Sequence, residues 1–398
     1  MEKTFTINAG TALLFNEFSQ IFNGYESAII NAGDMIVSKS LYEKLNDLNI
    51  SINSGNTKVI DVIGEITDIP ENSIITSEMS FEGCFLVCEG RLIIEDSAGL
   101  SGITGLYADT VYHPKSVNLS GVKGVTASRR VIYKDGAKLH FKSMEIDENS
   151  HIVLDSSFHW VDGRVRALNE AALGKLHQKG VSFRCDSLVI YNGLYDKFGT
   201  MFETDNYLLV PDDHAVVDEA TLNAGTSVLY GDKLFLVGDF TIPYDQVEHL
   251  KDFSSLIVSD TVTMPISAAA DFKAIGKAKH YDLYEGSLLT INGFKTIERE
   301  QLQEALKKGI SHTIRVNGAI AFQENVTADD VEAIAAIECN GVIYAPGSAR
   351  GVLDSKVNVI NGAVLDISAF DGDINNPMGL VEKMLGQGKT VNSGVFRM

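Results

Sequence analysis

A short phrase of polar and apolar residues recurs along the chain. In it, a turn pair that contains glycine separates two runs of apolar residues, as in Ala32-Gly33-Asp34-Met35-Ile36 and Val316-Asn317-Gly318-Ala319-Ile320. Glycine supplies positive φ angles or a close backbone approach where a chain turns between short strands. We therefore predict that the glycines of this phrase are the corners of a repeated unit. They are Gly33, Gly90, Gly136, Gly163, Gly193, Gly238, Gly286, Gly318, Gly341 and Gly362.

Asn-Gly is also the strongest two-residue signal for a β-hairpin, so isolated hairpins are the alternative. The spacing of the last corners favours stacked coils, because Gly318, Gly341 and Gly362 are 23 and 21 residues apart. A unit of this length cannot enclose a core alone and must pack against its neighbours.

Two units in the second half align without a gap, residues 238–253 over residues 260–275, at an offset of 22 residues. In each unit, alternation of apolar residues gives way to a spacing of three, which indicates a strand followed by a helix. Pro243, Pro265 and Pro346 lack an amide donor and are expected where the strand ends. The pattern predicts helices over residues 40–48, 167–177, 244–253, 268–275, 297–308, 328–337 and 378–385.

Residues 56–158 carry strand-like alternation with almost no helical spacing. The predicted fold is therefore an α/β repeat, a right-handed β-solenoid. We expect more purely β coils in a first region, residues 1–180, and strand-helix coils in a second region, residues 181–398. No Pro-rich or Ser-rich linker separates the regions, so we expect one continuous structure.

Leu234-Phe235-Leu236-Val237-Gly238-Asp239-Phe240 and Leu256-Ile257-Val258-Ser259-Asp260-Thr261-Val262 resemble leucine-rich repeats. In that family an asparagine ladder follows the strand, and here Asp239 and Thr261 take its position. The resemblance implies strand-helix coils and recognition of a protein on the strand-bearing face. It brings no catalytic residue with it.

Charge narrows the range of partners. Lys and Arg total 33 against 53 Asp and Glu, a formal net charge of -20, so phosphate backbones and anionic membranes would be repelled. The first residues lack the basic and apolar regions of a secretory signal. Four scattered cysteines do not form a disulfide framework. We expect a cytoplasmic protein that binds neither nucleic acid nor membrane, with a protein partner or a second copy of itself as its partner.

Some segments resemble chemical sites. Asp371, Asp373, Asn375 and Glu382 have the oxygen spacing of an EF-hand loop. Position 6 of that loop is Asn376 where glycine is required, and Asn376-Pro377 equally suits a helix start. The segment 386–390 ends like a phosphate-binding loop but has Lys383 at its first glycine position. We therefore expect no metal and no cofactor.

Further candidates are polar or aromatic clusters. Cys84 and Cys88 lie in an apolar strand, and we interpret them as core residues rather than zinc ligands. Phe158, His159 and Trp160 are either a recognition patch or part of the core. A carboxylate-rich segment is compatible with acid-base chemistry or with a solvated loop, and it contains Asp212, Asp213, His214, Asp218 and Glu219.

These observations predict a non-enzymatic interaction or assembly scaffold without catalytic residues. The alternative is a carbohydrate-active β-helix enzyme that uses Asp212 and Asp213. A third hypothesis is nucleotide binding through Gly388, Lys389 and Thr390.

Overall fold

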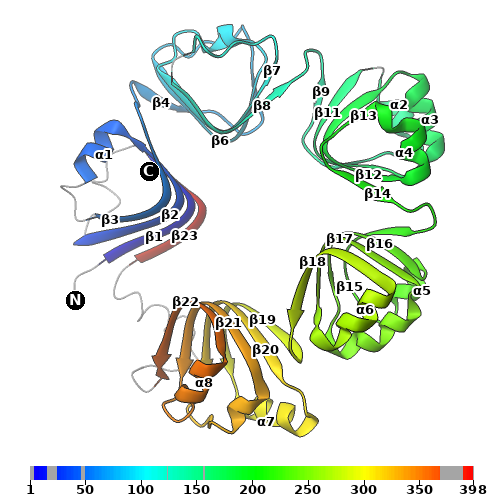
Figure 1. The fold of residues 1–398 in the computed structure, drawn as a ribbon. Coiled ribbons are helices and arrows are strands. Elements are labelled where there is room, and N and C mark those ends of the chain that lie inside the picture. The colour runs from blue at the N-terminus through cyan, green and yellow to red at the C-terminus, as the bar shows by residue number, and fades with distance from the viewer. Residues whose placement is uncertain are drawn as a thin grey trace.

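The computed structural model describes residues 4–15, 25–45, 50–122, 124–155, 157–367 and 389–397. The described chain is predominantly β, with several parallel sheets and short helices. We name its five sheets A to E in chain order. Figure 1 shows the sheets arranged in a ring, each contributed by a separate stretch of the chain except sheet A, which contains both the first and the last described strand.

The strands are grouped by sheet as follows. Sheet A has β1 (Thr4–Leu14), β2 (Ser27–Ser38), β3 (Ile50–Ile60) and β23 (Lys389–Arg397). Sheet B has β4 (Glu65–Asp68), β5 (Ser73–Ile75), β6 (Cys84–Ile94), β7 (Gly105–Pro114) and β8 (Val125–Tyr133). Sheet C has β9 (Lys138–His140), β10 (Met144–Glu145), β11 (Phe158–Ala167), β12 (Ser182–Tyr191), β13 (Phe202–Glu203) and β14 (Tyr207–Val210). Sheet D has β15 (Ala215–Thr221), β16 (Lys233–Thr241), β17 (Ser255–Pro265) and β18 (Gly276–Tyr284), and sheet E has β19 (Ser287–Ile297), β20 (His312–Phe322), β21 (Ile334–Ala345) and β22 (Val357–Asp366).

Short helices join many of the strands. The α-helices are α1 (Lys39–Leu45), α2 (Ser150–Val153), α3 (Glu170–Gln178), α4 (Asn192–Phe198), α5 (Thr226–Tyr230), α6 (Ala269–Ile275), α7 (Arg299–Lys308) and α8 (Arg350–Lys356). The 3₁₀ helices are η1 (Ser97–Leu100), η2 (Gly199–Met201), η3 (Tyr244–Asp252), η4 (Ile266–Ala268) and η5 (Asp330–Ala333). Helices α3, α5 and α7 lie on the outer side of the ring in Figure 1.

Neighbouring strands of the described chain pair in parallel, mostly with the next long strand in sequence. In sheet D, Phe240 lies opposite Val262, and the Thr261 amide donates to Asp239, 22 residues earlier. This register is the offset found in the sequence. Pro243 and Pro265 directly precede η3 and η4, as predicted for the strand-to-helix corner.

The helix predictions succeed where the helix is amphipathic and followed by a clear stop. Helices α3, α6 and α7 match the predicted segments closely, and α1 matches over its described part. The prediction over residues 328–337 was wrong beyond residue 333, because Ile334 and Ile337 begin β21 after the short η5. An apolar spacing of three fits both a helix and a 3₁₀ turn that leads into a strand. Residues 378–385 lie outside the described residues.

The strands bury side chains on both faces. In β16, Leu234 and Leu236 face the core of sheet D, beside Leu256 and Phe272. The alternate residues Phe235 and Val237 pack against Val189 and Val210 of sheet C. Strands buried on both faces are uninterrupted apolar runs, which is why residues 234–237 show no alternation.

Arginine–carboxylate pairs also join consecutive sheets. Nη1 of Arg129 in β8 lies 3.3 Å from Oδ1 of Asp162 in β11. Nη1 of Arg166 in β11 donates to Oδ2 of Asp218 in β15 at 3.0 Å. Arg315 of β20 binds both carboxylate oxygens of Asp282 in β18. Arg397 of β23 pairs with Asp68 of β4. Four steps between consecutive sheets thus carry a charged contact in addition to apolar packing.

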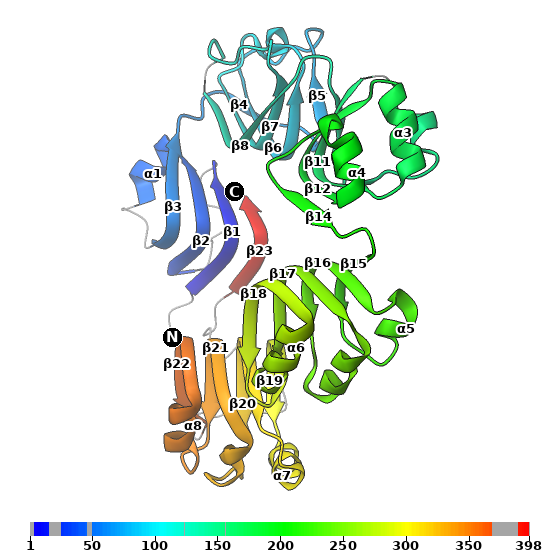
Figure 2. The ribbon, with the colours of Figure 1, turned by 45° about the vertical axis from the view of Figure 1, so that its right-hand side comes forward.

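The last strand of the chain completes the first sheet. β23 pairs with β1 in parallel, from Phe5 opposite Lys389 to Leu13 opposite Arg397. Figure 2 shows β23 beside β1 at the edge of sheet A. The first and the last described strands therefore lie side by side in one sheet.

Candidate functional site

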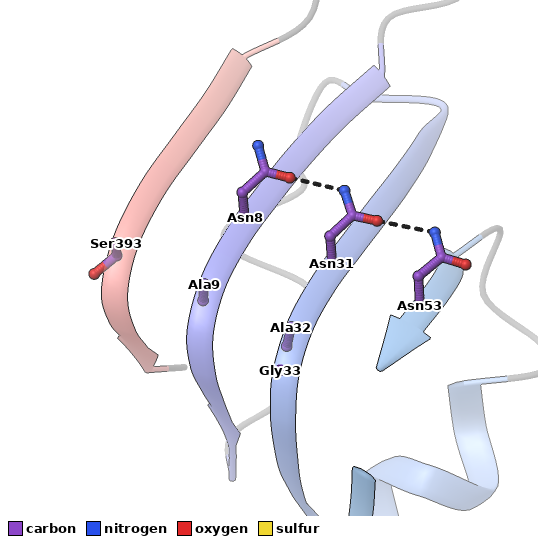
Figure 3. Close-up of a pocket in the computed structure, with 7 residues that line it drawn as sticks. All are labelled: Asn8, Ala9, Asn31, Ala32, Gly33, Asn53 and Ser393. Carbon is purple, nitrogen blue, oxygen red and sulfur yellow. Dashed lines mark hydrogen bonds between the residues drawn. The ribbon is translucent and has the colours of Figure 1, made fainter. Parts of the chain in front are cut away.

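A row of asparagine side chains crosses sheet A on its open surface. Asn8, Asn31 and Asn53 occupy equivalent positions of β1, β2 and β3. Asn31 Nδ2 donates to Asn8 Oδ1 at 2.7 Å, and Asn53 Nδ2 donates to Asn31 Oδ1 at 2.9 Å (Figure 3). An amide has two N–H donors and two acceptor lone pairs, so these bonds use only part of the hydrogen-bonding capacity of Asn31.

The sequence places this row through a repeated triplet. Each asparagine is followed by Ala or Ser and then by glycine, as in Asn31-Ala32-Gly33. A Cβ atom at Gly33 would lie 2.9 Å from the carbonyl oxygen of Gly10, and one at Gly55 would lie 2.9 Å from that of Gly33. The backbones of adjacent strands approach too closely here for a side chain, so glycine is required beside the amide row.

The row borders an open depression of about 670 Å³. Its lining comes from four strands, because Ser393 of β23 lies at one side and Asn53 of β3 at the other (Figure 3). The complete lining is Asn8, Ala9, Asn31, Ala32, Gly33, Asn53 and Ser393. The surface offers amides and small apolar side chains, and it is suited to contact rather than to enclosing a small molecule.

Sheet E carries a second amide row of the same kind. Asn292, Asn317, Asn340 and Asn361 lie opposite one another in its four strands. Asn340 Nδ2 donates to Asn317 Oδ1 at 3.1 Å. These four residues also line a depression of about 210 Å³, together with Arg315 and Glu338.

The carboxylate-rich segment after β14 forms a chain of hydrogen bonds. His214 is buried, with Nδ1 2.8 Å from Asp213 Oδ1 and Nε2 2.8 Å from Ser255 Oγ. Lys233 donates to Asp213 at 2.6 Å, and these bonds lower the pKa of Asp213 to about 2. The connectivity is that of a serine hydrolase triad. Its carboxylate, however, has a side chain that is 59% exposed, whereas the triad acid is buried.

Similar serine–histidine contacts recur at the starts of strands in other sheets. Ser287 Oγ of β19 lies 2.6 Å from His312 Nδ1 of β20. In sheet C, His159 Nε2 lies 3.1 Å from Ser157 Oγ, and His159 Nδ1 lies 2.9 Å from His140 Nε2. Burial lowers the pKa of His140, His159 and His312. Such recurrence favours a structural role, the satisfaction of polar groups where strands begin.

The other members of the carboxylate-rich segment have separate partners. Asp212 accepts the backbone N–H of Gly193 at 2.9 Å, at the start of α4. Asp218 pairs with Arg166, and Glu219 belongs to β15, with its side chain outside the described residues. The segment therefore does not gather its carboxylates into one group.

The remaining candidates are distributed as follows. His159 is buried, and Trp160 packs at the contact between sheets B and C beside Tyr112. Cys88 is buried and Cys84 half-buried, and both are free thiols. Lys389 and Thr390 lie in β23, where a phosphate-binding loop is not formed, and Gly388 lies outside the described residues. So do Asp371, Asp373, Asn375 and Glu382.

The predicted glycine corners fall in different settings. Gly33, Gly318, Gly341 and Gly362 lie inside strands beside the two amide rows, where adjacent backbones approach closely. Three others lie inside strands at register shifts, namely Gly90, Gly163 and Gly238. Gly136 lies in the turn before β9, Gly193 lies in α4, and Gly286 lies in the link between β18 and β19. A glycine with a polar residue next to it occurs in all of these places, so the phrase alone does not distinguish them.

Sequence reasoning missed the amide row of sheet A. The signal is present as Asn8-Ala9-Gly10, Asn31-Ala32-Gly33 and Asn53-Ser54-Gly55. A fourth copy, Asn392-Ser393-Gly394, stands near the end of the chain.

Comparison with family models, with curated proteins and with solved structures found no match to this chain. None of the described helices has the length and apolar character needed to cross a membrane.

Proposed function

We propose that this chain is a non-enzymatic interaction and assembly scaffold built from right-handed solenoid coils. The observation that carries the proposal is the pair of in-register amide rows on the open surfaces of sheets A and E. A row of identical polar side chains at strand spacing repeats the same donor and acceptor groups. Such a surface suits a partner that is itself regular, and a second copy of this chain is such a partner.

The coil architecture is supported by the strand order. Long consecutive strands pair in parallel, and helices or loops carry the chain back between them. Such crossovers are right-handed in about 98% of known cases, because of the twist of the strands. The stacked glycines beside each amide row fit coils that lie directly on one another.

The charged residues near Asp213 support a non-enzymatic function. A glycosidase needs one carboxylic acid with a raised pKa to protonate the leaving group. The pKa of Asp213 is lowered by Lys233 and His214, and Asp212 is engaged at the start of α4. The carbohydrate-active alternative would therefore require another acid.

Light scattering of the full chain across a concentration series tests the proposal. We expect self-association of the native chain and weaker association of the variant N31A/N53A, which removes most of the sheet A row. The matched control is Asn149→Ala, an exposed asparagine just before α2 that makes no side-chain capping bond. A strictly monomeric native chain, or row variants that associate like the control, would overturn the proposal.

A further inference from the structure

The strand β23 is part of sheet A by two independent criteria. Its backbone pairs with β1, and this register places Asn392 opposite Asn8 and Ser393 opposite Ala9. Its sequence carries Asn-Ser-Gly, the triplet of β3, whereas the strands of sheet E carry Asn-Gly without an intervening residue. Pairing and sequence therefore both assign β23 to sheet A. They do not assign it to sheet E, which comes just before β23 in the chain.

The side chains of β23 contact residues of sheets A and B. Phe396 packs against the core of sheet A, and Val395 packs against the cluster that joins sheets A and B. Arg397 pairs with Asp68, and its Nη1 lies 3.4 Å from Glu89 Oε1. These partners all lie within the first 107 residues of the chain, in or beside sheets A and B, so β23 binds its edge of sheet A without any contact from sheet E in this set.

The connection to β23 is long. β22 ends at Asp366 and β23 begins at Lys389, so residues 367–388 join them. A stretch of that length spans at most roughly 75 Å when fully extended. The edge of sheet A at β1 in a second copy of the chain can therefore lie within reach of β23.

We propose that β23 exchanges between copies, so that the last strand of one chain completes sheet A of another. This inference rests on the proposed scaffold function and identifies its partner as a second copy of the chain. Exchange of an identical element preserves every contact of the closed form, which makes it an accessible route to dimers. Intramolecular docking competes with it through a high effective concentration, so exchange increases with protein concentration.

The test uses cysteines on the two paired strands. Ala9 and Ser393 lie opposite each other, and both line the open depression in Figure 3. Directly paired strand residues are close enough for a disulfide. Two full-length chains with different tags, one with Ala9→Cys and one with Ser393→Cys, are refolded together at high concentration and oxidised. The half-buried Cys84 is replaced by Ser in every chain.

If β23 exchanges, oxidation should link two chains covalently. A single gel band of twice the chain mass should then carry both tags. The matched control pairs Ala9→Cys with Ser54→Cys, which lies in β3 beyond β2 and is not opposite Ala9. A mixed product no stronger than that control overturns the proposal, and so does a double variant A9C/S393C that links only within single chains. Association that depends on the amide row without mixed cross-links would leave the scaffold proposal standing and remove this one.

Discussion

Arg315 of β20 binds Asp282 of β18 with two hydrogen bonds, Nη1 to Oδ2 at 2.5 Å and Nη2 to Oδ1 at 2.7 Å. The pair joins sheets D and E, and Nε of the same guanidinium donates to Glu338 at 2.7 Å. The planar fork of arginine fits this two-point contact, whereas the ammonium of lysine offers a single point charge. The contact between the sheets therefore depends on the identity of the cation as well as on its charge.

We predict that Arg315→Lys destabilises the fold by about 1 kcal/mol, a modest value because both side chains retain partial solvent contact. Urea unfolding measures the change. The control is Arg184→Lys, whose partner Asp205 has a side chain that is 90% exposed, and we expect it to be near neutral. Equal effects of the two variants would contradict the special role of Arg315.

The same pair predicts a pH dependence. The hydrogen bonds from Arg315 lower the pKa of Asp282 below its usual value of 3.8. A carboxyl with a lowered folded-state pKa contributes stability above its unfolded pKa and loses it as the pH falls through the folded value. The stability difference between the native chain and R315K should therefore shrink below about pH 4. A difference that stays constant down to pH 2 would contradict this.

In sheet E, Gly318, Gly341 and Gly362 lie opposite one another in adjacent strands. Their close approach predicts a large loss of stability when a side chain is introduced. A Cβ atom at Gly341 would lie 1.7 Å from the carbonyl oxygen of Gly318, and its φ of 141° disfavours other residues. Gly341→Ala should cost on the order of 3 kcal/mol. The control Gly351→Ala lies in α8 with nothing within 4 Å of the new Cβ, and it should be neutral or stabilising by up to about 1 kcal/mol. Thermal unfolding of both variants checks the contrast.

The sequence predicts the repeat within a sheet because each repeated unit contains its own strand, corner and turn residues. The offset of 22 residues and the positions of Pro243 and Pro265 follow from local chemistry. The division into five sheets does not follow in this way. Phe235 and Val237 are apolar for contact with Val189 and Val210 of another sheet, and nothing near them in sequence indicates that partner.

The amide rows were predictable in part. Asn317, Asn340 and Asn361 stand in the recognised Asn-Gly phrase, whereas the extra Ala or Ser in sheet A concealed Asn8, Asn31 and Asn53. The bond between His214 and Ser255 was not predictable, because these residues are 41 positions apart and meet across the intervening strand β16.

The histidine pair of sheet C, His140 and His159, predicts acid sensitivity near neutral pH. His159 is 1% exposed, and burial lowers its pKa, as it does that of the adjacent His140. Lys138 also disfavours the charged form of His159, and Asp155 opposes the shift. Because the unfolded chain binds the proton more readily, stability should fall as the pH drops below about 6.5. His159→Gln should flatten this part of the pH–stability curve, measured by urea unfolding at a series of pH values.

The contact of His214 with Ser255 predicts a structural coupling. If the two side chains satisfy each other where β15 and β17 begin, His214→Ala and Ser255→Ala should each cost about 1–2 kcal/mol. The double variant should cost less than the sum of the two by about 1 kcal/mol, because each single change already breaks the same bond. Urea unfolding of the four chains measures this coupling. A fluorophosphonate probe supplies the second readout, and we expect it to leave Ser255 unlabelled in the folded chain. Labelling of Ser255 that disappears in His214→Ala would instead identify an activated nucleophile and contradict the non-enzymatic proposal.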